Sequence, residues 1–348
     1  DIPDELLVAK IRCARMISPK DNQVDIPIDN GFVGMVDRQD FDEFLRTRAA
    51  QSGAFRQQAV FDKIERDEVG ALWVYYTPVP DRPLKPGETG QRVKVSTRVI
   101  IGADGARSPV AKQHIPKADK TKYVFAYHEI IQSPDDVPNH DAERCDVYYQ
   151  GSVSPDFYGW VFPHGKTTSV GTGSADKGFS LRSATGHLRH IAGLADQPVL
   201  RREGAPIPLK PLPHWDNGRD ILVVGDAAGV VAPSSGEGIY YAMDCGRTMA
   251  RAAHEALKTG NPKHLKAGRK RFMKQHGKVF WILGVMQYFW YQNDKRREKF
   301  VKICEDKDVQ KLTFDAYMNK ELAKRDPWAH VRIFLKDMAH LLGLAKAG

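Results

Sequence analysis

The chain has 348 residues, of which 42% are hydrophobic and 27% charged, and its formal net charge is +9. This length and composition exclude a disordered or fibrous protein and leave room for two globular domains, while the positive charge favours anionic partners. Four scattered cysteines without a CxxC pair argue against a zinc site or a disulfide framework and indicate a reducing compartment such as the cytoplasm; no nucleic-acid-binding module is found.

The N-terminal region predicts short strands followed by a helix. Residues 11–18 and 31–36 are extended candidates. Residues 40–53 predict a helix, with Asp40 as its N-cap and Gly53 as its stop. Arg38 stands just before this helix and is either a ligand-facing residue or a solvated surface arginine.

Two strands follow, and the second ends in a distinctive turn. Residues 71–78 and 92–101 predict strands joined by a Pro- and Gly-rich hairpin connection at 80–90. The second strand alternates and then becomes fully apolar, as a strand entering a buried sheet does. It runs into Gly-Ala-Asp-Gly at 102–105, and such a turn at the carboxyl edge of a sheet suits a ligand or simply a tight reversal.

The middle of the chain predicts a separate, mainly antiparallel sheet. Its strands are expected over 122–131, 146–150, 158–163 and 167–172, with a short helix at 186–193. Tyr158, Trp160 and Phe162 alternate, so all three should project from one face of their strand. Such a row of rings forms either the core of the sheet or a surface for a long apolar ligand.

The segment 221–238, ILVVGDAAGVVAPSSGEG, is the most informative of the chain. An apolar strand leads into Gly225-Asp226, and Gly-Glu-Gly precedes a helix that starts near Ile239. Glycines let a backbone approach a ligand closely, and a helix N-terminus offers free N–H groups to an anion. A tight packing turn is the alternative for a Gly-rich loop alone, but the ordered combination is more specific than that.

The C-terminal third predicts helices from 239 to 344, interrupted near 261–262 and 326–327. The aromatic stretch 279–291 is too short to span a bilayer, and it is flanked by the basic triplets 269–271 and 295–297. This pattern is typical of a helix at a membrane interface or beside an apolar cavity, and equally of a buried core helix.

Taken together, the motifs resemble those of the para-hydroxybenzoate hydroxylase-type flavoproteins. In that group the aspartate of the Gly-Asp motif holds the ribityl or ribose part of FAD, and the following helix start faces the pyrophosphate; the Asp-Gly turn is implicated in NAD(P)H binding. The resemblance implies cofactor-binding roles for Arg38, Asp104, Gly105, Gly225, Asp226, Pro233, Gly236, Glu237 and Gly238.

The Tyr-x-Trp-x-Phe-Pro string further resembles the geranylgeranyl reductases of chlorophyll and bacteriochlorophyll synthesis. This implies an FAD- and NADPH-dependent oxidoreductase that saturates double bonds of a geranylgeranyl chain, in photosynthetic pigment synthesis. Tyr158, Trp160, Phe162 and Pro163 would line the isoprenoid cavity. No proton donor is assigned, and His164 is a candidate by position only. Peripheral attachment to a photosynthetic membrane is expected.

The implied fold is α/β (α+β), with a Rossmann-like FAD-binding domain, an antiparallel substrate domain and a helical C-terminal region. The expected ranges are 1–110 and 216–260 for FAD binding, 111–215 for substrate and 261–348 for the helices. The family's opening strand and Gly-x-Gly-x-x-Gly loop are not found, so an N-terminal segment and the first strand are expected to be missing. Alternatives are an FAD-dependent aromatic monooxygenase and a non-catalytic membrane-associated subunit.

Overall fold

The computed structural model describes residues 2–28, 31–80 and 90–310. The chain forms two compact units, each taken by itself here. Unit 1 comprises residues 1–37, 124–205 and 276–348, and unit 2 comprises residues 38–123 and 206–275. The first 37 residues thus belong with the central strands, whereas the sequence pattern places them in the FAD-binding domain.

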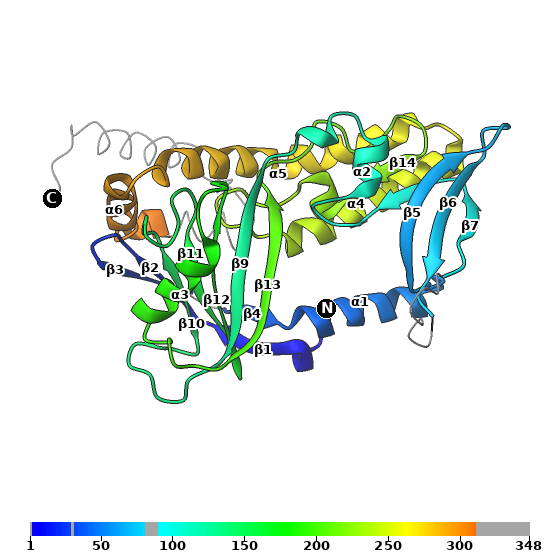
Figure 1. The fold of residues 1–348 in the computed structure, drawn as a ribbon. Coiled ribbons are helices and arrows are strands. Elements are labelled where there is room, and N and C mark those ends of the chain that lie inside the picture. The colour runs from blue at the N-terminus through cyan, green and yellow to red at the C-terminus, as the bar shows by residue number, and fades with distance from the viewer. Residues whose placement is uncertain (1, 29–30, 81–89, 311–348) are drawn as a thin grey trace. The chain divides into compact units, whose positions relative to one another are not determined.

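Unit 1 is built on a seven-stranded sheet (Figure 1). Its order is β13-β9-β12-β11-β10-β2-β3, and β10 and β2 pair in parallel, which makes the expected antiparallel layer a mixed sheet. The strands are β2 (Cys13–Ile17), β3 (Gln23–Pro27), β9 (Tyr123–Gln132), β10 (Arg144–Tyr148), β11 (Gly159–His164), β12 (Thr167–Ser174) and β13 (Val199–Pro208). The pair β1 (Leu7–Ile11) and β4 (Val33–Val36) forms a small sheet of its own, after the 3-10 turn Asp4–Leu6.

One face of this sheet is covered by helix α3 (Leu181–Ile191). The core between them contains Ile131, Val153, Val161, Val170, Leu188 and Leu194. Because neighbouring residues of a strand point to opposite faces, Trp160 and Phe162 point away from α3. The sheet therefore has an aliphatic face under α3 and an aromatic face on its other side.

The last described helices are α5 (Lys263–Trp290), which begins in unit 2, and α6 (Asp294–Ile303). Phe300 of α6 packs edge-on against Tyr149, with 5.1 Å between ring centroids. Arg297 is 1% exposed and donates hydrogen bonds to Asp294 and to the carbonyls of Pro155 and Tyr291. This guanidinium is a structural tie of unit 1 rather than part of a basic surface.

Unit 2 contains two sheets in its described residues. β8 (Ile100–Gly102) and β14 (Ile221–Val223) pair in parallel, while β5 (Ala59–Arg66), β6 (Leu72–Pro78) and β7 (Val93–Thr97) form an antiparallel sheet (Figure 1). The helices are α1 (Arg38–Gln51), α2 (Pro109–His114) and α4 (Ile239–Thr259), with 3-10 turns at Ala118–Lys120 and Gly225–Ala228. Trp215 is fully buried against Phe272, with ring centroids 5.2 Å apart.

Three sequence-based expectations about elements are corrected. The single strand expected over 92–101 is two strands in different sheets, because its alternating half joins the antiparallel sheet and its apolar half pairs with β14. Asp40 is not an N-cap but lies in the first turn of α1, where a negative carboxylate interacts favourably with the helix dipole. Helix α3 begins at Leu181, since Ser180 caps it through its side chain. The hairpin connection and the break near 326–327 fall on residues outside the described part.

Candidate active site

The two predicted ligand turns of unit 2 emerge from neighbouring parallel strands. Gly102 of β8 pairs with Val223 of β14, and the next amide, of Val224, donates a 3.0 Å hydrogen bond to the Gly102 carbonyl. A side chain at residue 102 would lie only 2.9 Å from Cβ of Val110, so the glycine lets α2 pack closely on the strand end. Because parallel strands end at the same edge, both turns lie at one edge of the sheet.

The Asp104 turn is held together by its own carboxylate. Ser108 donates a 2.6 Å hydrogen bond to Oδ1 of Asp104, and the amide of Val110 lies 3.1 Å from Oδ2. The Ser108 Oγ in turn accepts a bond from the amide of Ala111 and caps α2. Gly105 supplies the turn's left-handed residue, with φ of +79°. Asp104 therefore shapes the loop, and this turn presents its backbone rather than its carboxylate.

The Asp226 carboxylate is different, because no hydrogen bond to it occurs among the described residues. Burial raises its pKa, and the charge of Arg38 opposes that shift. A side chain at Gly238 would lie 3.3 Å from its Oδ1, so the missing Cβ keeps the space in front of this carboxylate open. A half-buried carboxylate that accepts no hydrogen bond from the described part of the chain fits a ligand hydroxyl such as that of a ribose or ribityl chain.

The rest of the Gly225–Gly238 segment has a backbone that suits the binding of an anion by main-chain amides. Gly225 and Gly236 have φ of +60° and +68°, values that other residues rarely adopt. Pro233 is buried, and the carbonyl of Glu237 accepts a bond from the amide of Ala232. Gly238 gives α4 no side-chain cap, so the first amides of this 21-residue helix remain available to a phosphate.

Arg38, the first residue of α1, is fixed by Asp42. Its Nε and Nη2 lie 3.0 and 2.9 Å from the two carboxylate oxygens, and this pairing raises the pKa of Arg38. The guanidinium also interacts electrostatically with Asp226. Arg38 is thus a cation held near the Gly-Asp motif, and it is paired with Asp42 of its own helix.

One hollow of unit 2 is lined from both turns. Ala106 and Ser108 from the first turn and Asp226, Ala227 and Gly229 from the second all line it. The two separated motifs therefore converge at this edge of unit 2. The hollow itself has a volume of about 10 Å³, enough for about one water molecule, so the binding of one dinucleotide by both turns stays a prediction.

The aromatic residues of unit 1 form a continuous row, called here the aromatic wall (Tyr158, Trp160, Phe162). Ring centroids are 6.0 Å apart for Tyr158 and Trp160 and 6.3 Å apart for Trp160 and Phe162. Pro163 is not part of it, because it alternates with these rings and lies on the face of Val161. Trp160 and Phe162 are half-buried, whereas Tyr158 is 7% exposed and stacks on Phe157. The wall offers an apolar surface at its Trp160 and Phe162 end.

A polar network, which the sequence patterns did not reveal, backs this wall. The Nε1 of Trp160 donates a 3.0 Å hydrogen bond to Oγ of Ser169, which lies 2.9 Å from Nδ1 of His128. The Nε2 of His128 is 3.1 Å from a carboxylate oxygen of Glu203. Gly171, opposite both rings in the sheet, makes the arrangement feasible, since any Cβ there would collide with Trp160 and His128.

Known proteins with similar sequences identify the family. Residues 33–271 match the family described as FAD binding domain. A relative named geranylgeranyl diphosphate reductase, from Rhodobacter capsulatus, is 55% identical over 99% of this chain and 85% of its own length. The chain belongs to the geranylgeranyl reductase family of FAD-binding proteins. It is an FAD-dependent oxidoreductase.

Other members of the geranylgeranyl reductase family agree. The chloroplastic geranylgeranyl diphosphate reductase of Oryza sativa is 33% identical over 98% of this chain and 75% of its own length. The fold is shared with a geranylgeranyl bacteriochlorophyll reductase-like protein from Thermoplasma acidophilum, with a TM-score of 0.75, 18% identity and coverage of 99% of this chain and 85% of that one. The α/β fold expected from the sequence, with its FAD-binding part, is thereby confirmed.

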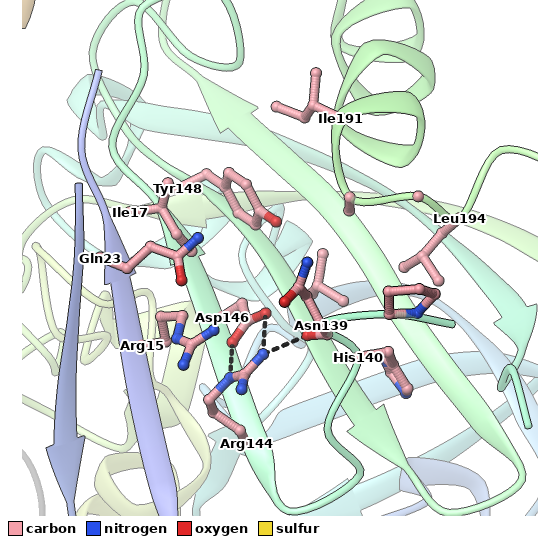
Figure 2. A pocket seen from close by; sticks show the side chains of 14 residues that line it. Arg15, Ile17, Gln23, Asn139, His140, Arg144, Asp146, Tyr148, Ile191 and Leu194 are labelled. Carbon is pink, nitrogen blue, oxygen red and sulfur yellow. Dashed lines mark hydrogen bonds and ion pairs between the residues drawn. The ribbon is translucent and has the colours of Figure 1, made fainter. Parts of the chain in front are cut away.

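The pocket in Figure 2 lies on the other face of the unit 1 sheet. It is lined by Val161 and by Leu194, which follows α3, and its volume is about 200 Å³. Arg144 is paired there with Asp146 at 2.6 Å, so its charge is already neutralised. This pocket is polar and smaller than ordinary cofactor sites, and in this reductase-family member it does not suit a long isoprenoid chain.

Proposed function

We propose that this chain uses NADPH to saturate double bonds of a geranylgeranyl chain, carried by a (bacterio)chlorophyll pigment or as the diphosphate, and converts it to the phytyl form. Relatives at up to 55% identity that carry the name geranylgeranyl diphosphate reductase support this substrate. The aromatic wall supports it independently, because half-buried rings in a row match a long, apolar, unsaturated chain.

The roles of the residues follow from the chemistry of an isolated alkene, which accepts hydride poorly. FAD, when bound and reduced, supplies the hydride. Asp226 and the amides at the start of α4 would hold its sugar and phosphate parts, and Arg38 would stand near them. Trp160 and Phe162 would keep water away from the double bond and stabilise positive character on the carbon that later takes the proton.

The reductant is tested by the flavin spectrum of the purified full-length protein. Anaerobic NADPH is expected to bleach the flavin absorption, and a geranylgeranyl substrate is then expected to restore it. Restoration without oxygen is the informative step, because a monooxygenase would need oxygen to reoxidise its flavin. A flavin that NADPH leaves oxidised, but that another reductant bleaches, would contradict the choice of NADPH.

The same proposal places the protein at the surface of a photosynthetic membrane, where such substrates reside. In the described residues no helix has both the length and the apolarity of a membrane span. Helix α5 instead has both buried and exposed large apolar side chains. Phe280 and Leu283 are buried, whereas Trp281 and Tyr288 are 69% and 70% exposed. These two lie seven residues apart, on one face of the helix, and Lys278 is exposed one turn before Trp281.

This exposed face fits an anionic lipid surface, since aromatic rings favour the headgroup region and the chain is basic overall. Not every flanking arginine contributes. Arg269 bonds to the Leu212 carbonyl and lies over the ring of Trp215, and Arg297 is buried. The expected basic surface around this helix is therefore smaller than the sequence pattern indicates.

Replacing Trp281 and Tyr288 together by alanine is expected to weaken binding to anionic vesicles about 100-fold or more, because each of the two rings withdrawn from lipid forfeits roughly 1.5–3 kcal/mol. Flotation with vesicles of anionic and of neutral lipid measures this. Phe55→Ala is the matched control, as that ring is 90% exposed in unit 2. Equal flotation of the double variant and the control would refute attachment through this face.

A further inference from the structure

A group that can carry a proton lies beside the aromatic wall. His128 lies beside Trp160, with ring centroids 6.2 Å apart, and both of its nitrogens have partners. One partner, the Ser169 hydroxyl, lies within the wall, because Ser169 is the cross-strand partner of Phe162 and bonds to Trp160. The other, Glu203, is about half exposed at 44%. The imidazole thus connects an exposed carboxylate to a hydroxyl among the rings.

The donors and acceptors of this network allow two states. The indole of Trp160 only donates and the Glu203 carboxylate only accepts, so Nε2 of His128 carries a hydrogen in both. With neutral His128, the Ser169 hydroxyl donates to Nδ1. With charged His128, Nδ1 donates to Ser169, whose oxygen then accepts from the imidazole and the indole at once. Its own hydrogen must then turn away from both of them and is free to be donated elsewhere.

We propose that His128, acting through the Ser169 hydroxyl, delivers the proton that completes saturation of each double bond. This rests on the proposed function. The hydride from the reduced flavin brings two electrons to one alkene carbon, and the other carbon takes the Ser169 proton as the π bond breaks. Ser169 recovers a proton from Nδ1 of His128, which is recharged from solvent at the Glu203 side. Two C–H bonds form, and one hydride and one proton are consumed.

The surroundings of His128 lower its pKa, so that the charged imidazole gives up its proton readily. Burial lowers the pKa of His128, as do Arg201 and His164, while the carboxylate of Glu203 opposes this shift. These groups and Ser169 come from β13 and β12, which flank β9 in the sheet, and from β11, the strand beyond β12. His164, the candidate suggested by its position, is held through Nδ1 by the carbonyl of Phe162 and has no such link to the wall through that nitrogen.

Reoxidation of chemically reduced flavin by a geranylgeranyl substrate, without oxygen, isolates this step from the reductant. His128→Gln in the full-length holoenzyme is expected to slow it about 100-fold or more, in the range typical of general acids. Flavin reduction by NADPH should be unchanged in the same variant. Ser169→Ala should be slow as well, and Ser169→Thr, which keeps the hydroxyl, should recover most of the rate. His187→Gln, on α3 at the other face, is the control.

The pH profile separates proton delivery from mere packing. The charged form of His128 is the donor, so the wild-type rate should fall as pH rises through its pKa, which lies below the ordinary histidine value. Glu203→Gln removes the charge that raises this pKa, and the fall should move to lower pH. His128→Gln should show no such limb.

Each outcome has a definite meaning. A normal reoxidation rate in His128→Gln, or an unchanged pH limb, overturns the relay. If Trp160→Ala impairs reoxidation while His128→Gln does not, the relay alone is wrong. If neither has any effect, the wall is not the substrate surface, and the proposed assignment of the isoprenoid site fails with it.

Discussion

Replacing Asp226 by alanine is expected to yield a folded protein that retains little flavin after purification. The wild-type carboxylate is half-buried and has no hydrogen-bond partner among the described residues, and we expect bound FAD to give it one. A hydrogen bond to a charged group contributes about 1.5–3 kcal/mol, which corresponds to a loss of FAD affinity of about 10- to 150-fold. Fluorescence titration of the apoprotein with FAD measures this.

Removing the charge of Asp226 should not lower the stability of the protein without FAD, although it lowers the affinity for FAD. Burial raises the folded-state pKa of Asp226, so the folded state favours the protonated form. That contribution is present at acid pH and is lost as pH rises through the folded-state pKa, which leaves a cost at neutral pH. Asp226→Asn should therefore not lower the free energy of unfolding of the apoprotein at neutral pH, and it should abolish this pH dependence.

Asp104→Ala is the matched comparison for Asp226→Ala. Its carboxylate bonds to Ser108 and to the amide of Val110 within its own turn, so its loss should destabilise the fold by about 1 kcal/mol, as the loss of a helix cap does. Its effect on FAD affinity should be the smaller one. Flavin loss in Asp104→Ala that equals the loss in Asp226→Ala would contradict the different roles given to the two carboxylates.

Trp160→Ala is expected to lower kcat/KM for chain reduction about 10- to 100-fold while bound FAD is retained. The indole is the middle ring of the aromatic wall, and burying an aromatic side chain against an apolar partner is worth roughly 1.5–3 kcal/mol. The substitution also removes the donor to Ser169. Steady-state kinetics with a geranylgeranyl substrate, and the flavin content of each preparation, are the measurements.

Trp73→Ala provides the control, because that indole lies in unit 2, in β6, and bonds to Asp67 rather than to the wall. It should leave kcat/KM unchanged. Gly171→Ala tests the same site from the neighbouring strand. A methyl group there would collide with the ring of Trp160 and with Cβ of His128, so turnover should fall without any loss of an aromatic ring. Full turnover in both Trp160→Ala and Gly171→Ala would remove the wall from the substrate site.

The sequence was most predictive where local pattern determines structure. The alternation correctly places Trp160 and Phe162 on one face of β11, whereas Tyr158 lies just before the strand and continues the row of rings. The order of strand, Gly-Asp and Gly-Glu-Gly leads to the edge of a parallel pair. Both results follow from the two-residue period of a strand and from glycine's conformational freedom. The roles of the cofactor-binding residues themselves stay predictions, tested by the variants above.

Long-range pairing was not predictable from such patterns. His128, Ser169 and Glu203 are 34 to 75 residues apart, and only the strand order brings β9 next to β12 and β13. The strand expected over 122–131 contains His128, but its pattern does not indicate the partners of that residue, and β13 was not expected as a strand at all. The one available signal was Gly171, a glycine within a strand beside bulky rings, which indicates close approach of neighbours.

Charge patterns were least reliable at Arg297. Its place in a basic triplet predicted a surface residue, yet it is buried and its two Nη atoms donate to acceptors from Asp294, Pro155 and Tyr291. Burial of an arginine depends on such acceptors, which come from distant segments and leave no mark in local composition.

The central claim is that this flavoprotein saturates an isoprenoid chain. Mass spectrometry of the product, after turnover with FAD, NADPH and a geranylgeranyl substrate under air, tests it most directly. The account predicts a gain of two hydrogens for each double bond reduced and no added oxygen. A product that gains one oxygen atom, or a substrate recovered unchanged while NADPH is consumed, would contradict it.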